Sequence, residues 1–274
     1  HTALPDVSTV RYVFWRIKFR LLNRLSGFHL LTSNRNTLES LRGFLSESSL
    51  RGIPVAYSGI DGDEIRQALE SRSDQVTLRQ RFGLPATAFL VFALGQFIER
   101  KGCVTLLEAA ATLREERPDL FYIWVGTDQL SADGQHQIES SGVADRFRYV
   151  SGSELGADRQ ALLSLLRLAD LFVLPSLKEG LPLALLEAMA LGKACIASNI
   201  NAIPEALHDG TNGRLVPPGD AGALAEEISE LASNDALRDR FAANGQQTVT
   251  EQFDERITAE TTLAYYETCW DDRG

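Results

Sequence analysis

The sequence predicts an α/β fold, in which a parallel sheet carries helices on both of its faces. From residue 86 onward, strand-length apolar runs alternate with helical patterns, which is typical of parallel strands joined by helices. The runs contain few polar positions, and this indicates strands that are covered on both sides. The five expected strands cover residues 88–94, 121–125, 147–150, 171–174 and 194–197.

Helical patterns separate and follow these strands. Small or polar residues stand at the carboxyl end of each strand, the edge at which open parallel sheets bind ligands, so we expect a ligand cleft there. Asp220 is expected to cap the helix over residues 221–232. The expected helices cover residues 104–116, 135–141, 158–168, 183–191, 203–207, 221–232, 235–250 and 254–270.

Residues 9–25 predict a basic amphipathic helix, with Arg16, Arg20 and Arg24 one turn apart. Such a helix either lies on an anionic membrane surface or packs on a sheet with its basic face in solvent. We favour the packed helix, and a peripheral membrane contact is the alternative.

Shorter elements are expected between this helix and the regular alternation. Residues 28–33 and 53–57 predict strands, and a helix over 36–44 has Asn34 or Asn36 as its cap. A turn-rich segment, 58–63, is the best candidate for a domain boundary. The polar stretch 64–82 is expected to be helical in part.

Composition narrows the classes of protein. With 274 residues, 44% hydrophobic and 23% charged, the chain has the balance of a globular protein with one large domain or two small ones. A formal charge of −10 argues against a general nucleic-acid binder, although the first 53 residues are basic. Three cysteines and four histidines are scattered without disulfide or metal-ligand spacing, which suits a reducing compartment. We expect no transmembrane helix and no signal peptide.

The first candidate site is the segment Glu179-Gly-Leu-Pro-Leu-Ala-Leu-Leu-Glu187, which follows the fourth predicted strand. Gly180 permits close approach to the backbone, and Pro182 suits the first helical position. The helix is apolar apart from Glu187, so this buried carboxylate needs a partner. Glu187 lies about 7–8 Å along the helix axis from its start and Glu179 just before the start, so free N–H groups form an anion site between the two acids. This order matches sugar, diphosphate and ribose; the alternative is an acidic cap with Glu187 in a structural ion pair.

The second candidate site is the loop Gly95-Gln-Phe-Ile-Glu-Arg-Lys-Gly102, after the first strand. Arg100 and Lys101 precede a helix, where positive charge opposes the helix dipole. A bound diphosphate would make that arrangement favourable, and a solvated basic turn is the alternative.

Seven short motifs follow one another over residues 88–250. They are Arg100-Lys-Gly102, Leu174-Pro-Ser176, Glu179-Gly-Leu-Pro182 with Glu187, Gly192-Lys193, Pro204-Glu205, Asp209-Gly-Thr-Asn-Gly213 and Val216-Pro-Pro-Gly-Asp220. In order and spacing, these motifs resemble the C-terminal half of retaining GT-B glycosyltransferases of family 4, also called glycosyl transferases group 1. The resemblance implies a Rossmann-like donor domain over residues 62–252, a remnant of an acceptor-binding domain over 1–61, and a crossing helix over 253–274.

The resemblance also implies residue roles. Glu179 would bind hydroxyls of the donor sugar, Lys101 with Arg100 would neutralise the leaving diphosphate, and Glu187 would hold the ribose diol. No metal or cofactor is expected, because cations and a helix N-terminus can stabilise the leaving group. The remaining donor-binding candidates are Gly95, Gln96, Tyr149, Val150, Ser151, Gly180, Leu181 and Pro182.

The activity implied is transfer of a hexose-type sugar, with retention, from a UDP- or GDP-sugar to a glycan, lipid or small molecule, in bacterial glycan or glycoconjugate synthesis. The expected location is the cytoplasm or the inner face of its membrane. Gln96 stands where relatives often carry Arg, so Arg100 compensates or diphosphate binding is weaker.

The chain begins with His1 and lacks most of an acceptor domain, so we expect a fragment of a longer protein. A nucleotide-sugar-binding module without catalysis is the alternative function. A GT-B epimerase or phosphorylase is the remaining rival.

Overall fold

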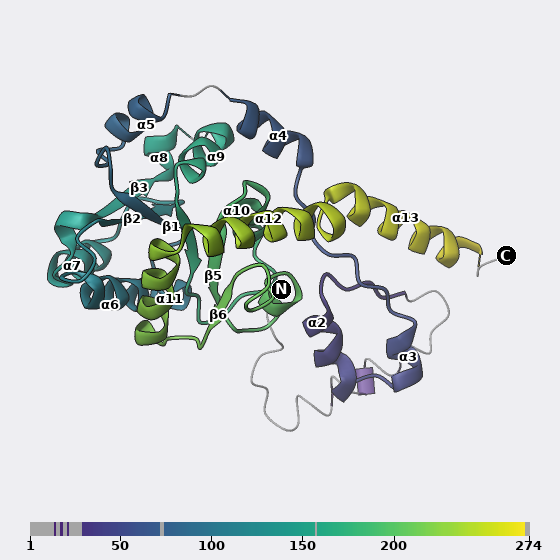
Figure 1. Ribbon diagram of the computed structural model, residues 1–274. Helices are drawn as coiled ribbons and strands as arrows, with labels where there is room; N and C mark the ends of the chain where they lie inside the picture. Colours follow the sequence, from purple (N-terminus) through teal and green to yellow (C-terminus); the bar gives the residue numbers. More distant parts are fainter. Residues whose placement is uncertain are drawn as a thin grey trace.

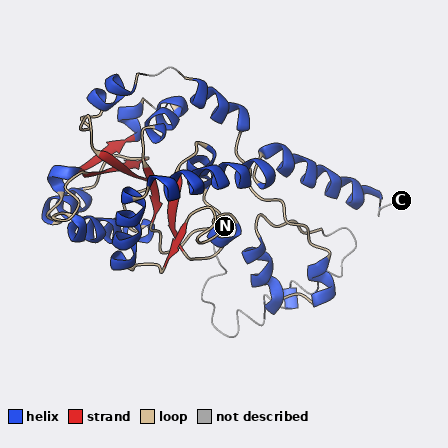
Figure 2. Cartoon of the chain, viewed as in Figure 1, coloured by secondary structure: helices blue, strands red, loops and turns tan. Residues whose placement is uncertain are grey.

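A six-stranded parallel sheet forms the centre of the protein (Figures 1 and 2). The computed structural model describes residues 29–71, 74–156 and 158–271, together with Phe14, Ile17, Lys18 and Leu21. The strand order is β3-β2-β1-β4-β5-β6. The strands are β1 Phe89–Leu94, β2 Leu120–Gly126, β3 Phe147–Ser151, β4 Leu171–Leu174, β5 Ala194–Ser198 and β6 Arg214–Val216. The predicted α/β fold is confirmed, and β6 is an edge strand that the sequence analysis did not assign.

Helices cover both faces of this sheet (Figure 2). On one face, α9 Arg159–Arg167 and α10 Leu183–Ala190 enclose a core with Phe92 and Phe172. On the other face, α6 Cys103–Leu113, α7 Ala132–Ser140 and α11 Ala221–Ser233 pack against Trp124 and Ile196. Each of these buried apolar side chains contributes roughly 1.5–3 kcal/mol of hydrophobic stabilisation. Because both faces are buried, the strands carry the continuous apolar runs seen in the sequence.

Polar caps begin most of the described helices. Asp220 accepts a hydrogen bond of 2.9 Å from the N–H of Ala223 and caps α11, as predicted. Asn34, one of the two predicted candidates, caps α2 Arg35–Ser40 through a 2.7 Å bond from the N–H of Thr37. The polar stretch after the boundary segment forms two capped helices, α4 Gly62–Glu70 and α5 Gln75–Arg81.

Two predicted strands near the N-terminus are wrong. Thr32 and Val55 form only an isolated parallel bridge, supported by bonds of 3.1 Å from Thr32 to Pro54 and 2.9 Å from Ala56 to Thr32. A strand needs continued pairing with neighbours, and these two short segments have only each other within the described residues. Between these two segments α2 continues as the 3₁₀ turn η1 Leu41–Gly43, and α3 Glu47–Arg51 follows.

The elements of the sheet also depart from prediction in two places. Only a 3₁₀ turn, η4 Ile203–Glu205, forms where a helix over 203–207 was expected. A short helix that was not predicted, α8 Gly152–Leu155, follows β3 and is capped by Ser151. Two further 3₁₀ turns, η2 Glu99–Lys101 and η3 Ala144–Arg146, precede α6 and β3.

The chain ends in two long helices, α12 Asp235–Gln252 and α13 Glu255–Asp271, and α13 extends from the sheet domain past the segment of α2 and α3 (Figure 1). At their junction, Ile60 and Phe253 share a backbone hydrogen bond of 2.9 Å. Gly59 is required there, because a Cβ would lie 2.5 Å from the Cα of Glu255. The proposed division at residues 61 and 252 remains a prediction.

Most of the predicted basic helix over 9–25 lies outside the described residues, and its membrane contact remains a prediction. Within the part of the chain that the structure describes, we find no helix that combines the length and apolarity needed to span a bilayer.

Candidate functional site

The order in which the chain adds strands to the sheet reverses between β1 and β4. β1 pairs with β2 on one side and with β4 on the other. The chain leaves β1 toward α6 on one face and leaves β4 toward α10 on the opposite face. Such a switch point opens a crevice beyond the carboxyl ends of the two strands. Both candidate segments of the sequence lie in the loops that flank it.

Lys101 and Glu179 form an ion pair across this switch point. The Nζ atom of Lys101 lies 2.5 Å from Oε1 of Glu179, and the two side chains are 19% and 9% exposed. Ser176 donates a 2.8 Å hydrogen bond to the same oxygen. Neither bond uses the second carboxylate oxygen of Glu179. A cation, a hydroxyl and a carboxylate therefore come together from positions 78 residues apart in the chain.

The two loops are also joined through their backbones. The N–H of Leu177 donates to the carbonyl of Arg100 at 2.9 Å, and the Arg100 guanidinium donates to the carbonyl of Lys178 at 3.3 Å. Gly102 has φ +79°, and a Cβ there would lie 2.0 Å from the carbonyl oxygen of Pro175. Only glycine fits both that conformation and that approach. Arg100 is thus exposed and braces the loop, whereas Lys101 points at Glu179.

Helix α10 begins next to this pair. Pro182 occupies the N-cap position, one residue earlier than predicted, and no side chain caps the helix. A Cβ built on Gly180 would meet nothing within 4 Å, so the turn has open space in front of it. Leu181 and Pro182 are half-buried. The first-turn N–H groups of α10 thus lack a side-chain acceptor, and the partial positive charge of the helix start remains available to an anion.

Glu187 lies in the core side of α10 and is only 4% exposed. Its two carboxylate oxygens are bound by the guanidinium of Arg159, from the start of α9, with Nη1 at 3.3 Å from Oε2 and Nη2 on Oε1. The ion pair that the sequence analysis gave as the alternative is therefore present.

The other donor-binding candidates line the edge near β1 and β3. Gly95 follows β1, and its carbonyl accepts a 2.7 Å bond from Nε1 of Trp124. Gln96 is exposed, and Ser151 caps α8. The Val150 side chain is fully buried in the core, so only its backbone can meet a ligand.

Tyr149 closes over the loop after β2. Its hydroxyl donates to the carbonyl of Asp128 at 2.7 Å, and a Cβ on Gly126 would collide with it. Burial raises the pKa of Tyr149 above its ordinary value. Beside it, a hollow of about 440 Å³ is lined by Gln129, Arg148, Tyr149, Ser151 and Glu154 among others. A hollow of about 510 Å³ between α4 and α12 contains none of the predicted site residues.

Glu205, from the Pro204-Glu205 motif, contacts the N-terminal segment. Its two carboxylate oxygens accept bonds of 2.8 Å from the N–H groups of Arg35 and Asn36 at the start of α2. Arg35 also donates to the hydroxyl of Tyr57 at 3.2 Å. The loop after β5 therefore fastens the N-terminal segment to the sheet domain.

Three residues of the site were not named as candidates. Ser176 lies in the quoted Leu174-Pro-Ser176 motif, directly after β4, so its position was readable. Asn201 donates a 2.5 Å bond to the carbonyl of Glu179 and has φ +47°, a conformation that no sequence pattern here indicated. Arg159 follows the cap Asp158, and the only signal for it was the requirement of Glu187 for a partner.

The chain is an α/β protein in which a charged pair joins two loops from opposite faces of the sheet at the switch point. The chain belongs to the glycosyl transferases group 1 family, which matches residues 74–248. It is 32% identical over 191 residues to the phosphatidyl-myo-inositol mannosyltransferase of Mycobacterium leprae, covering 69% of this chain and 49% of that protein. The chain spans about half the length of the curated relatives it matches first.

Solved structures show the same fold. A glycosyltransferase from Rickettsia africae superimposes with a TM-score of 0.82 at 18% identity, covering 97% of this chain and 69% of that one. The Anabaena protein HepE, solved in complex with UDP-glucose, gives 0.78 at 22% identity, covering 97% and 70%. Both are GT-B glycosyltransferase neighbours, and the GT-B fold class is confirmed.

Proposed function

We propose that this chain carries the donor half of a retaining family 4 glycosyltransferase, which moves a hexose-type sugar from a UDP- or GDP-sugar to a glycan, lipid or small-molecule acceptor. The observation that carries the proposal is the group of Lys101, Glu179 and Ser176 at the switch point. It stands beside a helix start that no side chain caps. Names of relatives and the UDP-glucose complex of a structural neighbour support a sugar nucleotide as donor.

The chemistry follows from the charges. The diphosphate of the donor would lie on the N–H groups at the start of α10, where the helix contributes roughly half a positive charge. Lys101 adds a full charge that neutralises the oxygens of the leaving group, and this stabilises the charge that develops as the sugar departs. Arg100, on the same loop, adds a second charge at longer range. No step of the proposal requires a metal or a cofactor.

Glu179 would accept hydrogen bonds from hydroxyls of the sugar. Lys101 and Ser176 both bind Oε1 of Glu179, and we assign the other carboxylate oxygen as the acceptor for the sugar hydroxyls. Hydrogen bonds to a charged acceptor are worth about 1.5–3 kcal/mol, so this residue would contribute strongly to recognition of the sugar. Gly180 and Leu181 supply the backbone of the turn between sugar and diphosphate.

A thermal-shift screen of UDP-, GDP- and ADP-sugars tests the proposal. Stabilisation by at least one sugar nucleotide supports it, and the absence of any shift with all three classes contradicts it. Lys101→Ala should then weaken UDP or GDP more than the free nucleoside, while Lys178→Ala, an exposed lysine of the facing loop, should change neither. Equal losses for diphosphate and nucleoside would reject the diphosphate role of Lys101.

A turnover assay separates the enzyme from a binding module. Donor hydrolysis or transfer to an acceptor supports the glycosyltransferase. Binding without either reaction, in a protein that contains the complete acceptor domain, supports the module.

A further inference from the structure

Three side chains from three helices form a continuous charged network behind the switch point. Glu64 comes from α4, Arg159 from the start of α9 and Glu187 from α10. The Nε atom of Arg159 lies 3.2 Å from Oε2 of Glu64, and both Nη atoms bind Glu187. The family resemblance assigns the ribose diol of the donor to Glu187, so the inference drawn from this network rests on the proposed binding of a sugar nucleotide.

Glu187 depends on Arg159 for both of its oxygens. The carboxylate sits on an otherwise apolar helix among Leu185, Leu186 and Met189, which are fully buried. An ionised carboxylate in such a place is costly without a cation and hydrogen bonds. The guanidinium binds both carboxylate oxygens, a two-point arrangement that fixes the plane of the carboxylate as well as its charge.

Arg159 is itself held in place and still has capacity. Five N–H groups project from a guanidinium, and the three contacts to Glu64 and Glu187 leave two unused. Its side chain is 42% exposed. Burial opposes its charge, but bonds and charge from Glu187 and Glu64 raise the pKa of Arg159 above its ordinary value. Gln160 Nε2, one residue on, lies 3.4 Å from the carbonyl of Glu64 and holds α4 against α9.

We propose that Arg159 is a positioning residue for the nucleoside end of the donor. By binding both oxygens of Glu187 it turns the remaining lone pairs of the carboxylate toward the place of the ribose hydroxyls. The guanidinium thereby converts a buried acid into an oriented acceptor for a vicinal diol, and Glu64 prevents it from swinging away.

The test compares a nucleoside diphosphate with its 2′-deoxy analogue by isothermal titration. UDP and 2′-deoxy-UDP are used, or GDP and 2′-deoxy-GDP if the donor screen selects guanine. The unaltered protein should bind the ribose form about tenfold more tightly, the scale of one hydrogen bond to a charged group. Arg159→Gln should reduce this preference to about twofold or less, while affinity for the deoxy form changes little. Glu64→Gln should reduce the preference by a smaller factor.

Arg167→Gln is the matched control. Arg167 lies on the same helix and binds backbone carbonyls of Ala68 and Ser71 at 2.6 and 2.7 Å, so its loss affects the same α4–α9 contact without touching Glu187. It should leave the ribose preference unchanged. If Arg159→Gln does not fold, Arg159→Lys keeps the charge without the two-point contact, and should also lower the preference.

These measurements distinguish the positioning role of Arg159 from the proposed binding of a nucleotide. A preference that is unchanged in the Arg159 variants, or an equal loss of affinity for both ligands, overturns the positioning role while nucleotide binding stands. Absence of nucleotide binding by the unaltered protein overturns the proposed function and this inference with it.

Discussion

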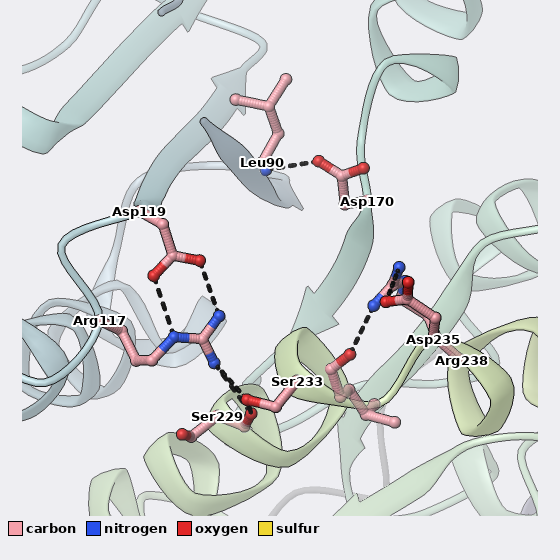
Figure 3. Close-up of polar contacts among 9 residues, drawn as sticks. Leu90, Arg117, Asp119, Asp170, Ser229, Ser233, Asp235 and Arg238 are labelled. Atoms are coloured by element: carbon pink, nitrogen blue, oxygen red, sulfur yellow. Dashed lines mark hydrogen bonds and ion pairs between the residues drawn. The ribbon is translucent and has the colours of Figure 1, made fainter. Parts of the chain in front are cut away.

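Charged side chains play opposite roles at the amino ends of the strands, the amino edge of the sheet, and at their carboxyl ends, the carboxyl edge. At the amino edge, Asp170 precedes β4 and accepts a 2.8 Å bond from the N–H of Leu90 in β1 (Figure 3). Arg117 and Asp119, before β2, are joined by two bonds of 2.7 and 3.0 Å, and Arg117 also donates to the carbonyl of Ser229 at 3.0 Å. At the carboxyl edge, Lys101 and Glu179 bind each other between two loops.

The difference lies in the groups that these charged side chains bind. At the amino edge, Asp170 and Arg117 bind backbone groups of a strand or a helix, so removing either weakens the joint between two elements, and Asp119 holds Arg117 in place. The loops at the carboxyl edge are already joined by the backbone bond from Leu177 to Arg100 and by the close approach at Gly102. Lys101 and Glu179 are therefore expected to be dispensable for folding and available to a ligand.

Gly102→Ala should have the largest effect on stability, because it breaks the joint at the carboxyl edge itself. The left-handed conformation costs an L-residue about 1–2 kcal/mol, and a Cβ 2.0 Å from a backbone oxygen adds a clash, for a total loss above about 3 kcal/mol. Urea unfolding measures it. Gly142→Ala is the control: φ is +78°, but the Cβ meets nothing within 4 Å, so only the conformational cost applies. Equal losses in the two variants would show that the approach to Pro175 does not matter.

Asp170→Ala should cost about 2 kcal/mol of stability, the scale of one hydrogen bond to a charged acceptor. The bond to the N–H of Leu90 disappears and the first residues of β1 lose a contact with β4. Affinity for a sugar nucleotide should remain that of the unaltered protein, since this residue lies at the far edge. Reduced nucleotide affinity at unchanged stability would contradict the contrast between the edges.

Asp119→Asn should have the smallest effect on stability, and this effect should depend on pH. Hydrogen bonds from Arg117 lower the pKa of this carboxyl below its ordinary value. A lowered pKa in the folded state stabilises the protein fully above the unfolded pKa, near 3.9, and the contribution is lost as pH falls through the lower folded value. Asp119→Asn should thus lose less than about 1 kcal/mol at pH 7, as for other surface pairs, and a smaller amount at pH 2, below the unfolded pKa. A loss that is equal at both pH values would exclude the ion pair as its source.

The sheet was predictable because its signal is local. Each of the five expected strands is an apolar run bounded by helical pattern, and the run is a direct consequence of burial on both faces. The two N-terminal strands failed for the same reason: an apolar run predicts burial but not the number of neighbouring strands, and among the described residues Thr32 pairs with Val55 alone.

The candidate site was predictable only in part. Glu179 and Lys101 could be named from charge placed beside glycine and a helix start, but nothing local shows that they bind each other. Their contact depends on β1 lying next to β4, a result of sheet order. Arg159 is the clearest omission, because Glu187 needed a cation and the sequence offers several at the ends of neighbouring helices.

The most direct measurement is the affinity of Glu179→Gln for a sugar nucleotide and for the corresponding nucleoside diphosphate. The variant should fold with an unchanged melting temperature, bind UDP-glucose or its GDP counterpart about 10–100-fold more weakly, and bind the diphosphate alone at least as well, since Lys101 is released from its partner. Unaltered affinity for the sugar nucleotide, or an equal loss for both ligands, would contradict the assignment of the Lys101–Glu179 pair to the donor.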